Sequence, residues 1–491
     1  EILYLLSNST GNILDDTVLI DTLAQSKVTS EEIKEAMKEA KVIEEEIEAN
    51  SELYRPVAKR ASLLYFVVAD MGFVDPMYQY SLQWFTALFV KGCQNSPGAS
   101  EVGKRVENLN DFFTQSIYNN VCRSLFERHK LLFSFILTIK ILQGDNNVDS
   151  TEYRFLLSGI APTRVKLPMP TSGWLETNVW EELCEMSGLP ALSKCAETFE
   201  ANLEKWQEIF ESAEPHKFTF PAPMDKITPL QRLCLLRCLR RDKVELAMQD
   251  FICEYLDERY IQPPPFNLKS CYLDSDPATP LIFILSTGSD PNKDLDLLAE
   301  EMNMTERLQR IALGQGQGKK ASTLVEKSLV NGDWVMLQNC HLSISWMPTL
   351  EQICEGFEPD KIHSEFRLWL TSMPSPAFPT SVLQNGVKVT KEPPAGIRAN
   401  LTNTYQKLTN ETCKRTDKPE EYAKLLFGLS FFHAIVVERK KYGPLGWNIP
   451  YEFNDTDMDI TAAQLALYVD SYEHIPYKVL QQLASVVNYG G

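Results

Sequence analysis

The chain has 491 residues, of which 44% are hydrophobic and 23% are charged, a composition typical of globular proteins. It is too long for one ordinary domain, and about three domains are expected. The 48 basic and 66 acidic residues give a formal net charge of −18, which argues against nucleic acid or an anionic membrane as the main partner. The sequence begins at Glu1 and ends at Gly490-Gly491, and we expect it to be a piece of a longer protein.

Eleven cysteines are scattered without a CxxC pair. Cys234 and Cys238 share a helix face, and Cys340 adjoins His341. Since no spacing supplies four metal ligands and no signal peptide is present, free thiols are expected rather than zinc or disulfides. The most apolar segment, Leu131 to Ile139, is shorter than the roughly 20 residues of a membrane span and predicts a buried helix.

The first 60 residues carry helical patterns. Gly11 to Lys27 predicts one amphipathic helix, and Thr29 with Glu32 has the capping-box pattern that starts a second. In this second helix the heptad-like core positions are Ile33, Ala36, Ala40, Ile43 and Ile47. Fewer than three heptads favour a short antiparallel coiled-coil hairpin or docking arm over a long rod, with a solvated single helix as the alternative.

The next 200 residues are predicted to be helical. Tyr54-Arg55-Pro56 is expected to restart the chain, helices continue as far as Phe210, and a helix pair covers Leu230 to Tyr260. Pro263-Pro264-Pro265 marks a linker or rigid turn. We therefore divide this half of the chain into a hairpin at 1–60 and a helical region at 61–265.

Short apolar strands alternate with helices after the proline run. The candidate strands are Leu281–Leu285, Leu308–Leu313, Trp334–Leu337 and Phe366–Thr371. Strands separated by helices predict a parallel sheet covered on both faces, here an α/β domain at 266–380. A helical lid is expected at 381–491, with helices at Glu420–Lys440, Thr461–Asp470 and Tyr477–Val487. The predicted fold class is α/β plus all-α.

A polar cluster follows the third strand, Trp334–Leu337. Open α/β sheets bind ligands at the carboxyl ends of their strands. In a phosphate-hydrolysing ATPase such positions carry acids, for magnesium and for positioning water. Here they carry the amides of Gln338 and Asn339. His341 lies at the same edge beside Cys340, for which a core position is favoured over catalysis.

The segment after the first strand, Ser286 to Asp294, is a poor phosphate loop. Such a loop needs glycines for exposed backbone amides and a Lys-Ser/Thr pair. Only Gly288 and Lys293 are present, and Asp290-Pro291 removes an amide and adds a negative charge. The sequence therefore has the frame of a nucleotide site without its charged ligands.

A second glycine-rich segment, LGQGQGKKA at Leu313 to Ala321, precedes a helix, and Lys319-Lys320 offers positive charge. It follows the second strand, however, and lacks GxxxxGK[ST] spacing. Phosphate binding at Gly314 to Lys319 is one interpretation, and a tight strand-to-helix turn is the other.

Longer stretches resemble the motor region of dynein heavy chains over nearly the whole sequence. They include SLLYFVVADM at Ser62, DPMYQYSLQWF at Asp75, TPLIFILSTGSDP at Thr279, WVMLQNCHLSISWMPTLE at Trp334, FRLWLTSMPSPAFP at Phe366, EPPAGIRANL at Glu392 and YGPLGWNIPYEFNDTD at Tyr442. The resemblance implies the end of the fifth AAA+ unit followed by the sixth. These units belong to a six-unit ring that hydrolyses ATP and moves toward microtubule minus ends.

The same resemblance implies roles for individual positions. Gly288 and Lys293 become degenerate phosphate-loop positions, and Gln338 and Asn339 degenerate Walker B positions. The hairpin at Asn12 to Asn50 resembles the buttress that braces the microtubule-binding stalk. We therefore predict a structural, non-catalytic AAA+ portion that closes the ring and couples its movement to the stalk, although the parent is an ATPase.

Two other functions are considered. An active ATPase would bind nucleotide at Gly288–Lys293 or Gly314–Lys319, but the lysine and acids that hydrolysis needs are missing. A helical scaffold unrelated to motors is disfavoured by the strand–helix alternation.

The resemblance also implies the surroundings of the chain. No cofactor or metal is expected within it, since ATP and magnesium belong to other units of the parent. The implied partners are neighbouring AAA+ units, the stalk coiled coil, the microtubule through that stalk, and dynein intermediate and light chains, without nucleic acid or membrane. The implied location is the cytoplasm and cytoskeleton, and EPPAGIRANL favours the axoneme of a cilium or flagellum.

Overall fold

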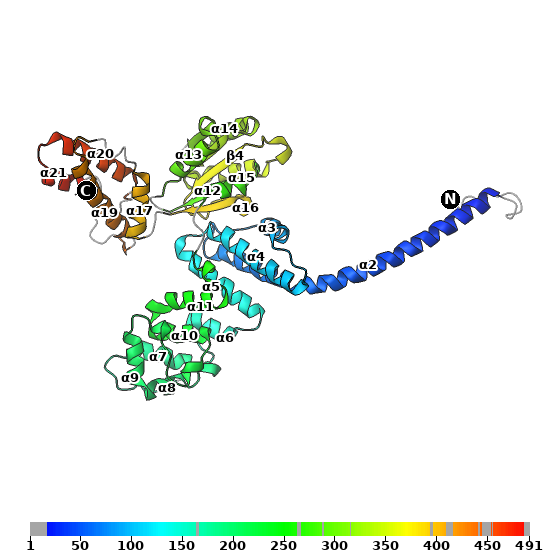
Figure 1. Cartoon of the computed structure of the whole chain (residues 1–491), viewed down its shortest axis with the longest axis horizontal. Coiled ribbons are helices and arrows are strands. Elements are labelled where there is room, and N and C mark those ends of the chain that lie inside the picture. Colours follow the sequence, from blue (N-terminus) through cyan, green and yellow to red (C-terminus); the bar gives the residue numbers. More distant parts are fainter. Residues whose placement is uncertain are drawn as a thin grey trace. The chain divides into compact units, whose positions relative to one another are not determined.

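The computed structural model describes residues 17–163, 166–262, 267–286, 289–314, 316–392, 396–408, 416–439, 442–443, 453 and 455–485. The chain folds as two compact units, and each is described by itself. One unit comprises Glu1–Leu63 and Lys91–Thr114, and the other comprises Leu64–Val90 and Gln115–Gly491. Figure 1 shows the helices and the sheet, with most helices and strand β4 labelled.

The first described element, α2, is one helix of 54 residues, Thr17–Asp70 (Figure 1). The predicted break at Thr29 is therefore wrong. The Thr29 hydroxyl donates to the backbone oxygen of Gln25 at 2.9 Å, a bond typical of a threonine inside a helix rather than of an N-cap. Pro56 also lies inside α2, so the predicted restart at Tyr54-Arg55-Pro56 is wrong as well.

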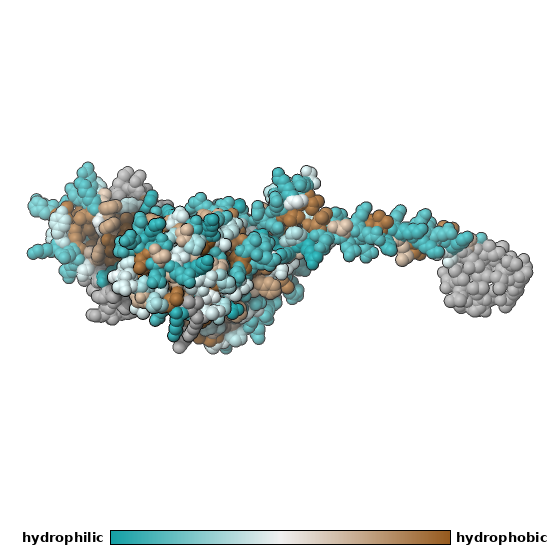
Figure 2. Space-filling view, turned by 90° about the horizontal axis from the view of Figure 1, so that it is seen from below, coloured by the Kyte–Doolittle hydropathy of each residue, from teal (hydrophilic) through white to brown (hydrophobic). Residues whose placement is uncertain are grey.

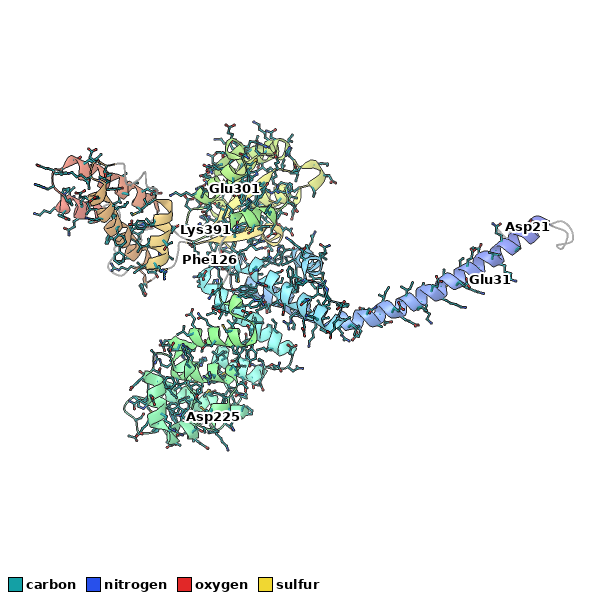
Figure 3. The ribbon with its side chains drawn as sticks, viewed as in Figure 1. Asp21, Glu31, Phe126, Asp225, Glu301 and Lys391 are labelled. Atoms are coloured by element: carbon teal, nitrogen blue, oxygen red, sulfur yellow. The ribbon has the colours of Figure 1, made fainter. Side chains whose placement is uncertain are left out.

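The predicted heptad core lies along α2 with its side chains exposed. Ile33, Ile43 and Ile47 are 54%, 55% and 62% exposed, and Ala36 and Ala40 are exposed too. Figure 2 shows α2 as mainly hydrophilic surface interrupted by small hydrophobic patches, and Figure 3 labels Asp21 and Glu31 on this helix.

Within the described residues, the predicted antiparallel hairpin is wrong. Because the helix is continuous from Thr17, the segment up to Lys27 cannot fold back onto the heptad positions. The part of that segment before Thr17 lies outside the described residues. Packing of the heptad positions against another element stays a prediction.

The described residues from the end of α2 to the sheet are helical or irregular, as predicted. The helices are α3 Leu82–Asn95, α4 Val102–Cys122, α5 Glu127–Gly144, α6 Ser150–Ser158, α7 Thr177–Met186, α8 Cys195–Ala201, α9 Leu203–Glu211, α10 Pro229–Leu239, α11 Val244–Tyr255 and α12 Leu268–Leu273. Short 3-10 turns are η1 Met71–Phe73, η2 Pro190–Leu192, η3 Pro215–Lys217, η4 Met224–Lys226, η5 Arg241–Lys243 and η6 Glu258–Tyr260. The expected buried helix at Leu131 to Ile139 is confirmed within α5. The proline run lies outside the described residues.

The sheet has five parallel strands in the order β2-β3-β4-β1-β5. They are β1 Leu281–Leu285, β2 Leu308–Ala312, β3 Trp334–Gln338, β4 Arg367–Ser372 and β5 Val387–Lys391. Between them lie α13 Asn292–Glu301, α14 Gly318–Asn331, α15 Met347–Glu355 and α16 Thr380–Asn385, with the turns η7 Thr305–Arg307, η8 Cys340–Leu342, η9 Ile344–Trp346 and η10 Pro359–Lys361. The four predicted strands are confirmed to within one or two residues.

The fifth strand, β5, is not among the predicted strands, and it lies after the predicted domain boundary at 380. β5 pairs in parallel with β1, from Leu281 opposite Val387 to Leu285 opposite Lys391. Its sequence VKVTK alternates apolar and polar residues, as an edge strand does, whereas the other strands were recognised as apolar runs.

The core of the sheet is apolar, as a parallel sheet covered on both faces requires. Trp334, Val335 and Leu337 in β3 are wholly buried, which confirms the burial expected for that strand. The ring of Trp334 lies 5.4 Å from that of Trp369 in β4, so the two central strands share an aromatic contact.

The lid is helical, as predicted. Its helices are α17 Ile397–Lys407, α19 Pro419–Arg439, α20 Asp455–Ser471 and α21 Tyr477–Leu483. Tyr422 and Leu426 of α19 are buried with Leu465 and Val469 of α20 in a core of its own.

Candidate functional site

The carboxyl ends of the strands meet at one edge of the sheet, which we call the carboxyl edge: Ser286, Ser289 to Asn292, Gln338 to His341, and Thr371 to Met373. In the sheet, β4 and β3 lie on one side of β1 and β5 lies on the other. The chain therefore changes direction at β1, and open α/β sheets bind ligands at such a switch point. The predicted site residues can be tested against this arrangement.

A carboxylate of the chain itself lies at the start of α13. The Asp290 carboxylate accepts from the backbone N–H of Asn292 at 2.9 Å and from its side-chain amide at 2.7 Å. Helix N-terminal amides are the groups that bind phosphate in nucleotide sites. A carboxylate at this position takes one amide and repels an anion, so the described residues here do not fit a nucleotide phosphate.

Lys293 does not reach into the carboxyl edge. Its Nζ lies 3.5 Å from Oδ2 of Asp459 in α20, and both side chains are more than half exposed, which makes the pair weak. Gly288, the other predicted phosphate-loop position, lies outside the described residues.

Gln338 and Asn339 at the end of β3 both bond within the chain, Gln338 through its side-chain amide and Asn339 through its backbone. The Gln338 side chain donates to Oδ1 of Asn292 at 2.7 Å, and the backbone N–H of Asn339 donates to Oγ1 of Thr371 at 2.9 Å. Asn339 has a φ of +57°, a left-handed conformation that asparagine adopts more readily than most residues. Asn292, in the segment after β1, is bonded to Gln338 of β3, and Asn339 after β3 is bonded to Thr371 of β4. The structure therefore brings the ends of these three strands together at one edge of the sheet.

Cys340 and His341 are separated by their environments. Cys340 is wholly buried, and this burial raises the pKa of its thiol to about 12, so it is not a nucleophile near neutral pH. Nδ1 of His341 accepts from the backbone N–H of Met373 at 3.1 Å, and partial burial lowers the pKa of the imidazole. The predicted core role of Cys340 is confirmed.

The glycine-rich segment before α14 has a packing explanation. Gly316 has a φ of +78°, and a Cβ at Gly318 would lie only 2.5 Å from Cδ1 of Trp346. Gly314 and Gln317 close a turn through a 3.3 Å backbone hydrogen bond. Lys319 is exposed. This geometry favours the strand-to-helix turn over a phosphate loop at Gly314 to Lys319.

A second polar cluster, which the sequence did not predict, lies along β5. We call it the β5 joint: Gln79 to Ser81, Arg123 to Leu125, Lys388 and Thr390. The backbone N–H of Thr390 donates to the oxygen of Arg123 at 2.9 Å, and its hydroxyl donates to that of Leu125 at 2.8 Å. Figure 3 labels Lys391 at the end of β5 and Phe126 after Leu125. Strand β5 pairs with β1 along one edge. The bonds to Arg123 and Leu125 satisfy polar groups on its other, outer edge.

Lys388 is the buried charge of the β5 joint, with 2% of its surface exposed. Its Nζ donates to the backbone oxygens of Gln79 and Leu383, each at 2.6 Å, and lies 3.8 Å from the centre of the Tyr80 ring. Burial lowers the pKa of this lysine well below its ordinary value, and Arg123 acts in the same direction. A lone lysine among valines gives no local signal of contacts to residues 309 positions away.

Within the residues that the structure describes, no group of three or more His, Cys, Asp or Glu side chains is arranged to hold a metal ion. Among the described helices, none is both long enough and apolar enough to cross a membrane.

Comparisons with known proteins agree with this architecture. Residues 276–390 match the dynein heavy chain region D6 P-loop domain, and residues 422–491 match the dynein heavy chain AAA lid domain. The relatives include dynein axonemal heavy chain 1 of Rattus norvegicus and of Homo sapiens, each 46% identical over 492 residues, and the dynein-1-beta heavy chain of the flagellar inner arm I1 complex of Chlamydomonas reinhardtii, 44% identical over 493.

Each of these alignments covers the whole chain but only 11% to 12% of the relative. The strand alternation, the helical lid and the similarity over the full sequence lead to one family. The chain belongs to the dynein heavy chain family, as a C-terminal region of its motor that contains the D6 P-loop and AAA lid domains.

Proposed function

We propose that this chain is a non-hydrolysing part of a dynein ring that transmits movement between its neighbours and the microtubule-binding stalk. The main observation behind this proposal is that side chains at the carboxyl edge form hydrogen bonds with one another. The Asp290 carboxylate accepts from the first backbone N–H of α13, and Asn292 accepts from the Gln338 side chain, so these three side chains at the carboxyl edge are already paired within the chain.

The chemistry of these residues supports the same conclusion. Magnesium at a nucleotide site is held by carboxylates together with the phosphates and water. The positions after β3 offer the amides of Gln338 and Asn339, and the carboxylate of Asp290 lies where it opposes a phosphate. We therefore expect no bound ATP or magnesium to be required by this part of the motor.

The coupling role is supported by rigid connections. In the β5 joint, backbone and side-chain bonds tie the segments at Gln79 to Ser81 and Arg123 to Leu125 to the edge of the sheet. A movement of these segments is therefore passed to β5 without a flexible linker. The long helix α2 adds a continuous element whose exposed Ile33, Ile43 and Ile47 are available to a partner helix.

The proposed surroundings follow from the relatives. Neighbouring AAA+ units of the same heavy chain and the stalk coiled coil are the proposed direct partners, and the microtubule and the intermediate and light chains are reached through the parent. The relatives' names place those proteins in axonemes and in a flagellar inner arm. We propose a cilium or flagellum as the location of this chain too.

Calorimetric titration of the 491-residue chain with Mg-ATP tests the nucleotide part of this proposal. We expect no saturable heat at micromolar ATP. The control is a titration with Asp290→Asn, which removes the opposing charge and leaves an amide acceptor for the cap. Magnesium-dependent micromolar binding by the unaltered chain would contradict the proposal.

The coupling part is tested in the intact motor with Ile33, Ile43 and Ile47 changed to Asp. Burying one isoleucine contributes roughly 1.5–3 kcal/mol, so three charges should undock α2 from its partner and reduce microtubule stimulation of ATP turnover. Changing the exposed Glu31, Glu35 and Glu39 to Gln is the matched control. Full microtubule stimulation in the triple Asp variant would rule out a bracing role for α2.

A further inference from the structure

Helix α19 of the lid has an unusual outward face. Phe427, Phe431 and Ile435 recur at four-residue intervals and are 53%, 42% and 38% exposed. Residues at this spacing lie along one side of a helix. Gly428 on the same side is exposed as well, so an apolar stripe more than two turns long faces solvent.

Helix α17 continues this surface. Ile397 and Tyr405 are 38% and 41% exposed, and the rings of Tyr405 and Phe427 lie 6.3 Å apart. Between the two helices is a groove of about 380 Å³, lined by Leu401, Thr402, Tyr405 and Phe427. Figure 2 shows hydrophobic surface over the lid helices, drawn at the left. We call this surface the lid groove.

These side chains are not members of the lid's own core. That core is formed by the opposite side of α19, where Tyr422, Leu426 and Leu429 are buried with Leu465 and Val469 of α20. Single exposed apolar residues are ordinary, but a contiguous patch of them marks a binding surface. The lid groove is therefore a candidate docking site.

Two exposed basic residues adjoin the groove. Arg398 of α17 and Lys424 of α19 are both exposed, next to Ile397 and one turn before Phe427. None of the four lining residues is charged. Nearby, the carboxylate of Glu438 already accepts from the backbone N–H of Gly396 at 2.7 Å. Glu420 and Glu421 lie in the first turn of α19. The groove thus matches a ligand with an apolar ridge and carboxylates beside it.

We propose that the lid groove binds an amphipathic helix with acidic flanks, contributed by another part of the same heavy chain. Two rows of apolar side chains at four-residue spacing are the pattern of a groove that receives the apolar face of a helix. The set of side chains is much smaller than the roughly 20–30 residues a side of a stable bimolecular interface. A tethered helix needs less contact because its effective concentration is high.

Most of the heavy chain lies beyond the 491 residues, since the relatives are matched over only 11% to 12% of their length. We therefore infer that a segment of the same heavy chain occupies the lid groove. The proposal does not depend on whether the carboxyl edge binds nucleotide.

Position-specific thiol labelling tests the tethered occupant. Thr402→Cys places a thiol in the groove, and its labelling rate is measured by peptide mass in the 491-residue chain and in the intact heavy chain. We expect at least tenfold slower labelling in the intact chain. Equal rates in the two proteins would overturn the proposal.

The intact heavy chain carrying both Thr402→Cys and Phe431→Asp is the second arm. A buried carboxylate in the groove should displace the helix and restore fast labelling. If position 402 stayed protected, the segment that covers it would not be a helix held by this apolar groove, and the proposal would be overturned.

Helical peptides test the chemistry of the groove on the 491-residue chain. One 18-residue probe has leucines on one face flanked by glutamates, and a second has lysines in place of the glutamates. We expect at least tenfold tighter binding of the acidic peptide in fluorescence anisotropy, and a tenfold loss with Phe427→Ser. Leu467→Ser, an exposed site on α20, is the control and should change nothing.

Lys424→Glu should reduce or reverse the preference for the acidic peptide. Equal binding of both peptides, or equal losses with Phe427→Ser and Leu467→Ser, would overturn the proposed charge complementarity. Self-association of the 491-residue chain that Phe427→Ser abolishes would identify a second copy as the occupant and would overturn the tethered one.

Discussion

The carboxyl edge and the β5 joint are two polar clusters on the same sheet, and they are bonded differently. At the carboxyl edge, short side chains such as Asp290, Asn292 and Gln338 bond to one another at the surface. At the β5 joint, Lys388 is buried and bonds to the backbone oxygens of the nearby Leu383 and of Gln79, which is 309 positions away. In working ATPases the carboxyl edge binds nucleotide, but here its side chains bond to one another. The β5 joint instead connects β5 to the segments at Gln79 to Ser81 and Arg123 to Leu125.

The difference has energetic consequences. A hydrogen bond near solvent contributes little because water replaces a lost partner, whereas a buried acceptor left unpaired costs about 1–3 kcal/mol. We therefore expect mutations in the β5 joint to destabilise the fold and mutations at the carboxyl edge to be tolerated. A mutation in the apolar core should lower the free energy of unfolding more than a mutation in either cluster.

The largest effect is expected from Trp334→Ala, in the apolar core of the same sheet. The wholly buried side chain contacts Trp369 and Tyr272, and its loss should lower the free energy of unfolding by about 3–5 kcal/mol. Urea denaturation of the 491-residue chain measures this. Leu467→Ala at an exposed position is the control, and a loss below about 1 kcal/mol for Trp334→Ala would show that this core is not well packed.

Lys388→Met is expected to have the next largest effect. Methionine has a similar length but no donor, so the oxygens of Gln79 and Leu383 lose their partner and the free energy of unfolding should fall by about 1–3 kcal/mol. Lys293→Met is the matched control, since its exposed ion pair with Asp459 contributes about 0–1 kcal/mol. Equal effects of the two changes would remove the contrast between the joint and the carboxyl edge.

The stability contributed by Lys388 should depend on pH. Its pKa in the folded chain is lowered from 10.5 by burial, so above that lowered pKa the unfolded chain binds more protons than the folded one. The free energy of unfolding then rises with pH until about pH 10.4. The stability difference between the unaltered chain and Lys388→Met should grow from pH 7 to pH 10 in urea denaturation, and a shrinking difference would indicate a raised pKa.

The sequence predicts the elements whose signals are local. The apolar run of Trp334–Leu337 places a buried strand, and the amides that follow it fall at the carboxyl edge as expected. Thr29 is ambiguous, because the same residue serves as an N-cap or bonds back to a preceding turn within a helix. The burial of Lys388 could not be predicted, since its bond to Gln79 spans 309 positions and its strand alternates like an exposed one.

The smallest effect is expected from Asn339→Asp, which restores one acid at the carboxyl edge. Asn339 is half-buried with a φ of +57°, and aspartate accepts this conformation almost as well as asparagine. The backbone bond to Thr371 is kept, so the free energy of unfolding should change by less than about 0.5 kcal/mol.

The free energy of unfolding of Asn339→Asp should be compared with that of Asn339→Val, which changes the same position. A β-branched residue is strained at positive φ, so it should destabilise by about 1–3 kcal/mol, although it alters the same position. Asn339→Asp should also create no ATP turnover, because magnesium needs several ligands and a phosphate and Asp290 still opposes the phosphate. Steady ATP hydrolysis by the 491-residue chain carrying Asn339→Asp would show that a single missing acid, rather than the bonding of the whole carboxyl edge, keeps this domain from acting as an ATPase.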